Sequence, residues 1–214
     1  MGRRASSPEP PRPEPSPLIR ALCSPGFRQF FAARTISQWG DTFNAVAIVI
    51  LVYRITGSGL KVGGAVAFEI APVLLLGFVA GAAVDRLSRR RVLVTADLVR
   101  AGIAALLAVF HSQLWTVYAA AFGLSAFSVF FHPAAASVLP ALVGEVGVVG
   151  ANSAVWSAAV ISQIALAPTA GALVASAGAG PAFALNAVSF LASAALLTRL
   201  RLPARPQPRP GSPR

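Results

Sequence analysis

The sequence predicts an all-α fold, an integral membrane bundle of six helices, and two observations carry that prediction. Of 214 residues, 56% are hydrophobic and only 12% are charged, whereas a soluble domain carries about 25% charged residues. The apolar residues also gather in blocks of about 20, the length that a helix needs to cross the hydrocarbon core of a bilayer. Because lipid offers no hydrogen-bond partner to the backbone, each block is expected to be helical.

Six stretches of the sequence qualify as membrane-crossing helices. In chain order they are residues 28–53, 61–84, 92–110, 115–139, 147–176 and 181–198. Turn-forming residues lie where the chain must change direction, at Thr56-Gly-Ser-Gly59, at Pro140 with Gly144, and at Gly178-Ala-Gly-Pro181. The fifth stretch is longer than a straight crossing requires, so its first turns are expected at the membrane interface. The bundle as a whole covers residues 26–199, and its many small residues allow close helix packing.

Polar segments flank this apolar body at both ends. Residues 1–25 are rich in proline and lack the apolar core of a secretory signal peptide. Residues 200–214 are rich in proline and arginine. Neither composition can bury enough apolar surface to fold by itself. The sequence therefore predicts a disordered tail over residues 1–25 and a second tail, or the start of a linker, over residues 200–214.

The basic residues lie almost entirely on one side of the predicted bundle. With six spans, both tails and the even-numbered loops share a side, and that side carries fourteen arginines. The opposite side carries only Arg54 and Lys61. Lysine and arginine accumulate in the cytoplasmic loops of membrane proteins. The sequence therefore predicts a multi-pass protein of the cell membrane, surrounded by lipid, with both termini in the cytoplasm.

Charge distribution and missing motifs exclude several other classes of function. The net charge of +11 would suit a nucleic-acid partner, but the basic residues lie in tails and one loop rather than on a folded face, so none is expected. Cys23 is the only cysteine, which excludes an internal disulfide and a cysteine-based metal site. No phosphate-binding loop, zinc-protease motif or serine-hydrolase elbow is present. We expect neither an enzyme nor a bound cofactor or metal ion.

A charged loop joins the second and third predicted helices, within the sequence GAAVDRLSRRRVL. It fits the pattern G-x-x-x-D-R-x-x-R-R through five residues: Gly81, Asp85, Arg86, Arg89 and Arg90. This loop resembles the signature loop of the major facilitator superfamily, although Ser88 stands where that family has glycine. The resemblance implies a gating role, in which the aspartate and arginines form charge contacts that close the cytoplasmic side and break when the transporter opens inward.

The resemblance extends over most of the membrane body. Three stretches resemble the family's exporter branch, which includes enterobactin-exporter-like and drug-efflux proteins: residues 26–58, 150–157 and 183–194. Pro168 and Gly171 match the helix-five pattern of proton-coupled antiporters, whereas Gln163 departs from it. The family fold has two six-helix halves that hold substrate between them. The resemblance implies that this chain is the N-terminal half. Three explanations remain open: the chain is truncated, it pairs with a second polypeptide that supplies the other half, or it forms a homodimer.

Arg34, Asp41 and Glu69 lie inside the first two predicted spans, where an ionisable group is costly and is a functional candidate by default. Arg34 and Asp41 lie on one face of the first span, about 10 Å apart along its axis and too far apart to touch directly. Asp41 and Glu69 are expected at similar depths on consecutive helices, and a carboxyl group in a low dielectric takes up a proton readily. We expect Asp41 or Glu69 to carry a coupling proton or to meet a cationic substrate group. The alternative is a structural or solvated charge.

Asp97 and Arg100 form another candidate pair near the start of the third span. Their spacing of three residues brings side chains together on a helix, which predicts a structural ion pair beneath the charged loop. His132 precedes Pro133 inside the fourth span and is a candidate proton relay.

Together these features predict a transmembrane transporter rather than an enzyme. The expected activity is gradient-driven, proton-coupled export of a small hydrophobic or chelating molecule by alternating access. The alternative is a non-transporting half or a membrane scaffold subunit that needs a second six-helix half.

Overall fold

The computed structural model describes residues 24–200, apart from the side chain of Asp85. Within this range the protein is helical and has no β-strand, so the all-α prediction is confirmed. The predicted tails lie outside the described residues except for Ser24, Pro25 and Leu200. Five helices follow one another, and each is long and apolar enough to cross a membrane. They are α2 Pro25–Thr56, α3 Gly59–Arg86, α4 Arg89–Val109, α5 Leu114–Ala177 and α6 Ala179–Thr198.

Local sequence explains how α2 begins and ends. Pro25 occupies the first turn, where its missing N–H has no intrahelical partner to lose. The hydroxyl of Ser24 accepts a hydrogen bond from the backbone N–H of Phe27, which caps one of the free donors of that turn. Gly57 ends the helix with φ 63°, a left-handed conformation that favours glycine.

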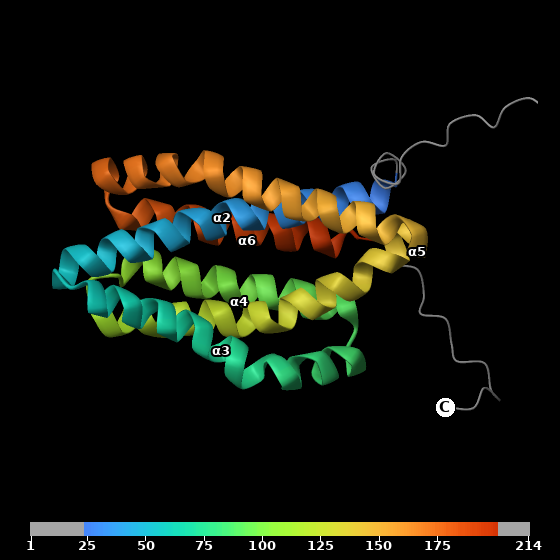
Figure 1. Ribbon diagram of the computed structural model, residues 1–214, viewed down its shortest axis with the longest axis horizontal. Helices are drawn as coiled ribbons and strands as arrows, with labels where there is room; N and C mark the ends of the chain where they lie inside the picture. The colour runs from blue at the N-terminus through green and yellow to red at the C-terminus, as the bar shows by residue number, and fades with distance from the viewer. Residues whose placement is uncertain (1–23, 201–214) are drawn as a thin grey trace, which may run out of the picture.

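The longest helix, α5, contains 64 residues and is broken at Gly144. A straight helix of that length would measure about 96 Å, about three times the thickness of the hydrocarbon core. Gly144 takes φ 70° and ψ 165°, a combination open essentially only to glycine. The helix continues through Pro140, and the chain turns back at Gly144 (Figure 1). α5 therefore has a first arm, residues 114–143, and a second arm, residues 145–177, which lie over the fourth and fifth predicted spans.

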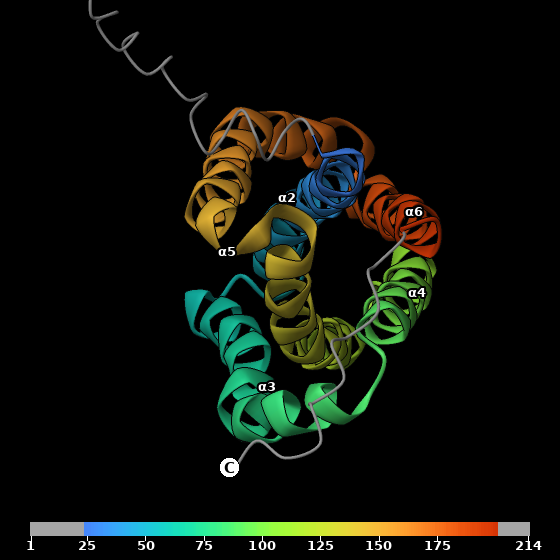
Figure 2. The ribbon, with the colours of Figure 1, turned by 90° about the vertical axis from the view of Figure 1, so that its right-hand side faces the viewer.

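The helices run along a common axis, and α5 contacts each of the other four. α2 contacts α6, α5 and α3, while α4 packs against α6 and α5, and α3 packs mainly against α5. The end-on view shows α2, α6 and α4 beside one another (Figure 2). Two large apolar clusters stabilise the bundle. One includes Phe27, Leu93 and Phe131, and the other includes Val52 and Phe183.

Gly40 allows a close approach between α2 and α6. A Cβ atom at this position would lie 1.9 Å from Ser189 Oγ and 2.8 Å from Ser189 Cβ. We expect Gly40→Ala to lower the free energy of unfolding by about 1–3 kcal/mol, because one helix must shift to make room.

The matched control for this substitution is Gly102 in α4, where an added Cβ would meet no atom within 4 Å. Gly102→Ala should be neutral or stabilising by up to about 1 kcal/mol, since alanine favours the helix more than glycine does. Unfolding by SDS in mixed micelles, followed by circular dichroism, measures both variants. Equal stabilities of the two variants would contradict the contact between Gly40 and Ser189.

Candidate functional site

Two adjoining cavities lie along α2 and α5. Cavity A has a volume of about 460 Å³ and is lined by α2 and both arms of α5. Cavity B has a volume of about 630 Å³ and is lined by α2, α3 and the first arm of α5. Gln38 and His132 line both cavities. Ligand pockets in proteins measure about 300–1,000 Å³, so each cavity has room for a small organic molecule.

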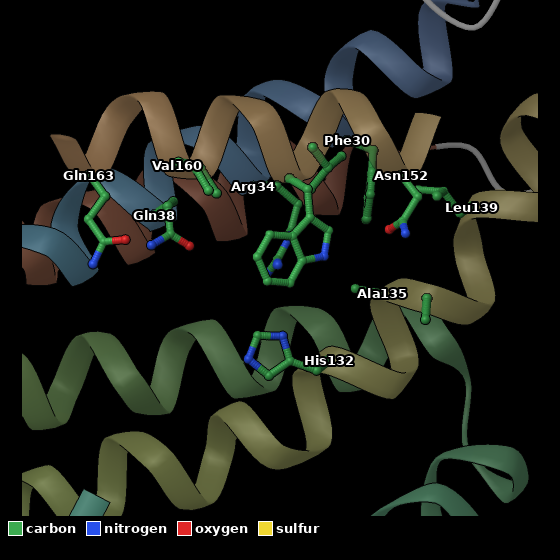
Figure 3. A pocket seen from close by; sticks show the side chains of 13 residues that line it. Phe30, Arg34, Gln38, His132, Ala135, Leu139, Asn152, Val160 and Gln163 are labelled. Atoms are coloured by element: carbon green, nitrogen blue, oxygen red, sulfur yellow. The ribbon is translucent and has the colours of Figure 1, made fainter. Parts of the chain in front are cut away.

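The side chains of cavity A come from helical faces with a regular spacing. Arg34 and Gln38 are one turn apart on α2. Asn152, Trp156 and Gln163 lie on one face of the second arm of α5, at positions i, i+4 and i+11. Figure 3 shows Gln38 and Gln163 toward one end of the cavity and Asn152 toward the other. Arg34 and His132 lie between these ends (Figure 3).

Arg34 gives cavity A its charge. Apart from His132, it is the only ionisable side chain among the residues that line this cavity. Its guanidinium carbon lies 5.1 Å from the centroid of the Phe131 ring, within the range of a cation–π contact. Among the described side chains, Arg34 forms no ion pair and donates no hydrogen bond. Its N–H donors are therefore available to a ligand.

Cavity B carries the opposite charge. Two carboxyl groups line it, Asp41 from α2 and Glu69 from α3. No lysine or arginine lines this cavity. Asn44 adds an amide to the same wall. Arg34 and Asp41, which share a face of α2 in the sequence pattern, line different cavities. The structure thus separates the membrane charges into a basic cavity and an acidic one that meet at Gln38 and His132.

Asp97 and Arg100 form a buried ion pair that lines neither cavity. Their exposed fractions are 0% and 1%. Asp97 Oδ2 also accepts a hydrogen bond of 2.7 Å from Ser193 Oγ on α6, and Arg100 Nη1 donates one of 3.2 Å to Ser128 Oγ on α5. The guanidinium of Arg100 stacks against Phe131, 4.5 Å from its centroid. The pair therefore ties α4 to α5 and α6.

Phe131 connects this ion pair to cavity A. Its ring contacts Arg100 and also Arg34, whose guanidinium carbons lie 4.5 and 5.1 Å from the ring centroid. The ring is buried, with an exposed fraction of 1%. A buried aromatic ring can hold the guanidinium of Arg34 in place through a cation–π contact, without using its hydrogen-bond donors.

Two arginines anchor the charged loop to neighbouring helices. Arg89 Nη1 donates a hydrogen bond of 2.8 Å to the carbonyl of Ser137, and Arg90 Nη2 donates one to the carbonyl of Thr198. Thr198 is the last residue of α6, so its carbonyl has no partner within the helix. Gly81 lines cavity B, and Arg86 is exposed. The side chain of Asp85 lies outside the described part of the structure, so its gating contacts stay a prediction.

The residues of the antiporter-like pattern lie away from the cavities. Neither cavity is lined by Pro168 or Gly171. Gln163, which departs from that pattern, does line cavity A. The residue that departs from the antiporter-like pattern is thus the one that contributes a polar side chain to a cavity.

Several cavity residues were absent from the sequence-based candidates: Gln38, Asn44, Asn152 and Trp156. The signal that could have identified them is helical periodicity. Gln38 lies four residues after Arg34 and three before Asp41, on the same face of α2. Asn152 and Trp156 share a face with Gln163, and this face becomes recognisable only when the polar residues of the second arm of α5 are read together.

Comparisons with known proteins agree with this architecture. The family profile described as Major Facilitator Superfamily matches residues 8–214. An uncharacterised MFS-type transporter, YfiS, of Bacillus subtilis is 29% identical over 80% of this chain and 41% of its own length. The enterobactin exporter EntS of Salmonella typhimurium is 28% identical over 86% of this chain and 46% of its own length. The chain spans less than half the length of these relatives, and it belongs to the major facilitator superfamily of membrane transporters.

Proposed function

We propose that this chain is one half of a gradient-driven exporter that couples proton movement to the transport of a small hydrophobic or chelating molecule. The observation that carries the proposal is the pair of adjoining cavities, one with an unpaired arginine and one with two carboxyl groups. In a coupled transporter, the cargo and the coupling ion must influence each other's binding, and the two cavities share Gln38 and His132. The similarity to the enterobactin exporter of Salmonella supports export as the direction.

Asp41 and Glu69 are the proposed coupling groups. Both line the acidic cavity B. Carboxyl groups placed at membrane depth are costly and mark ion pathways in transporters. Since His132 lines both cavities, it is the proposed route by which protonation in cavity B affects the charge around a ligand in cavity A.

We further propose that a second six-helix half completes the transporter, as in the family fold, with both termini of this chain in the cytoplasm. The contacts of Arg89 and Arg90 support a gating role for the charged loop, because they join the start of α4, where the loop ends, to α5 and α6. A loop held in this way moves with the whole half. Asp85 is then the group that contacts the second half and is released when the two halves rock apart.

Replacing the two acids of cavity B is expected to abolish proton coupling. Proteoliposomes with an imposed pH gradient can be tested for accumulation of the dye Hoechst 33342 and of 2-naphthoate. We expect Asp41→Asn with Glu69→Gln to reduce gradient-driven accumulation at least about tenfold, since neither amide can carry a proton at neutral pH. Glu145→Gln, which removes an acid outside both cavities, is the matched control and should transport like the unmodified protein.

Two results of this experiment would contradict the proposal. Full gradient-driven transport by the double variant would exclude Asp41 and Glu69 as coupling groups. If the unmodified protein moved neither probe while it still bound a ligand, the alternative would be favoured, namely a non-transporting half or scaffold subunit that needs a second six-helix half. Asp85→Asn tests the loop in the same assay and should lower transport without lowering ligand binding.

A further inference from the structure

Cavity A has the chemistry of a site for an organic anion. Apart from His132, Arg34 is its only ionisable side chain, and the carboxyl groups that could neutralise this arginine line the other cavity instead. An unpaired guanidinium at membrane depth is costly. A carboxylate bound against it forms charge-assisted hydrogen bonds with a planar donor array that fits its two oxygens.

The same cavity offers an aromatic surface. Trp156 lines cavity A and is 67% exposed, so its indole is not covered by other described side chains and can stack against a ligand ring. Phe30 and the ring of His132 also line the wall. His132 points from the first arm of α5 toward α2 and the second arm (Figure 3). A flat ring bound here would have aromatic side chains on more than one side.

The remaining polar side chains of cavity A are uncharged. Gln38, Asn152 and Gln163 are amides, which hydrogen-bond polar groups without attracting either sign of charge. They lie toward the two ends of the cavity, with Arg34 between them (Figure 3). The cavity therefore favours a ligand with one negative group rather than a polyanion.

We propose that cavity A binds a planar aromatic carboxylate, with the carboxylate on Arg34 and the ring on Trp156. This inference rests on the proposed transport function and names the class of substrate, and it also predicts that aromatic cations are rejected by cavity A. Phe131 is a positioning residue in this site, because its ring contacts Arg34 on the side of the buried Asp97–Arg100 pair.

Equilibrium dialysis with the full chain in lipid nanodiscs tests the proposal, with empty nanodiscs subtracted. The probes are 2-naphthoate, the neutral 2-naphthamide and the cationic 2-naphthylmethylammonium. We expect the protein to bind 2-naphthoate roughly 10- to 100-fold more tightly than the amide, the range for a hydrogen bond to a charged group. Equal binding of the three probes, or preference for the cation, would overturn the proposal even if every variant failed to fold.

Variants then locate the binding site. Arg34→Gln should weaken 2-naphthoate binding roughly 10- to 100-fold and leave 2-naphthamide binding nearly unchanged, while Arg34→Lys should retain part of the preference for the anion. Trp156→Leu should weaken the binding of both 2-naphthoate and 2-naphthamide by roughly 3- to 10-fold. The matched control is Arg28→Gln, an exposed arginine on the same helix outside both cavities. An equal loss with Arg28→Gln and Arg34→Gln would overturn the assignment to cavity A.

Measurements of binding and of transport distinguish the proposed anion site from the proposed transport function. If 2-naphthoate binds with the expected selectivity but no gradient moves it, the anion site stands and the transport function fails. If Hoechst 33342 is transported while 2-naphthoate shows no preference over its amide, transport stands and the anion site fails. Glu145→Gln should leave 2-naphthoate binding within roughly twofold of the unmodified protein, because Glu145 lines neither cavity.

Discussion

Arg100→Met is expected to lower the free energy of unfolding by about 3–5 kcal/mol, the usual cost of removing one partner of a buried ion pair. The substitution leaves the carboxylate of Asp97 fully buried with Ser193 as its only described side-chain partner. It also removes the cation–π contacts of the guanidinium with Phe131 and Phe190. The ring centroids of these residues lie 4.5 and 4.3 Å from Arg100 Cζ. SDS-induced unfolding in mixed micelles measures the loss.

A double variant distinguishes the buried charge from simple loss of packing. Asp97→Asn with Arg100→Met removes both charges, and the asparagine can still accept the hydrogen bond from Ser193. We expect it to recover at least about 2 kcal/mol relative to Arg100→Met alone, since no unpaired charge remains. Arg91→Met changes an exposed arginine of the same helix and should shift stability by no more than about 0.5 kcal/mol. A double variant no more stable than Arg100→Met would contradict the ion-pair explanation.

The ion pair shows how far the sequence could predict the core. The spacing of Asp97 and Arg100 within one helix was enough to predict their pairing, because neighbours on a helix follow from local geometry alone. Their other partners could not be predicted. Ser193 is 96 residues away from Asp97, and Ser128 is 28 residues away from Arg100. Such contacts depend on how each helix is rotated about its axis, which hydropathy does not determine.

The candidate site, too, was predicted only in part from the sequence. Hydropathy predicted which segments are helical, and the cost of a charge in lipid singled out Arg34, Asp41 and Glu69. The separation of Arg34 from the two acids was not predicted, since it depends on which helices enclose each cavity: both arms of α5 line cavity A, whereas α3 and the first arm line cavity B. The aromatic wall was also missed. Tryptophan in a membrane helix most often suggests an interface anchor, and only the fold shows Trp156 lining a cavity.

Cavity A depends on the chain reversal at Gly144, so this glycine is expected to be sensitive to substitution. Its φ of 70° and ψ of 165° suit glycine, and a β-branched residue there is a genuine steric outlier. Gly144→Val should lower the free energy of unfolding by about 3 kcal/mol. Because His132 and Trp156 come from opposite arms of α5, any straightening of the break would also open cavity A.

Spin labels on the two arms measure this reversal directly. Trp115→Cys and Ser176→Cys, in a Cys23→Ser background, place labels on exposed positions at the far ends of the two arms. The second arm returns toward the end of the bundle at which the first arm begins (Figure 1), whereas a straight helix would separate these positions by about 90 Å. We expect Gly144→Val to broaden the label distances and shift them upward, while Gly102→Val, at an open helical position, leaves them unchanged. An unaltered distance distribution together with unaltered stability in Gly144→Val would show that the turn does not need glycine, and the two walls of cavity A would then be held by helix packing alone.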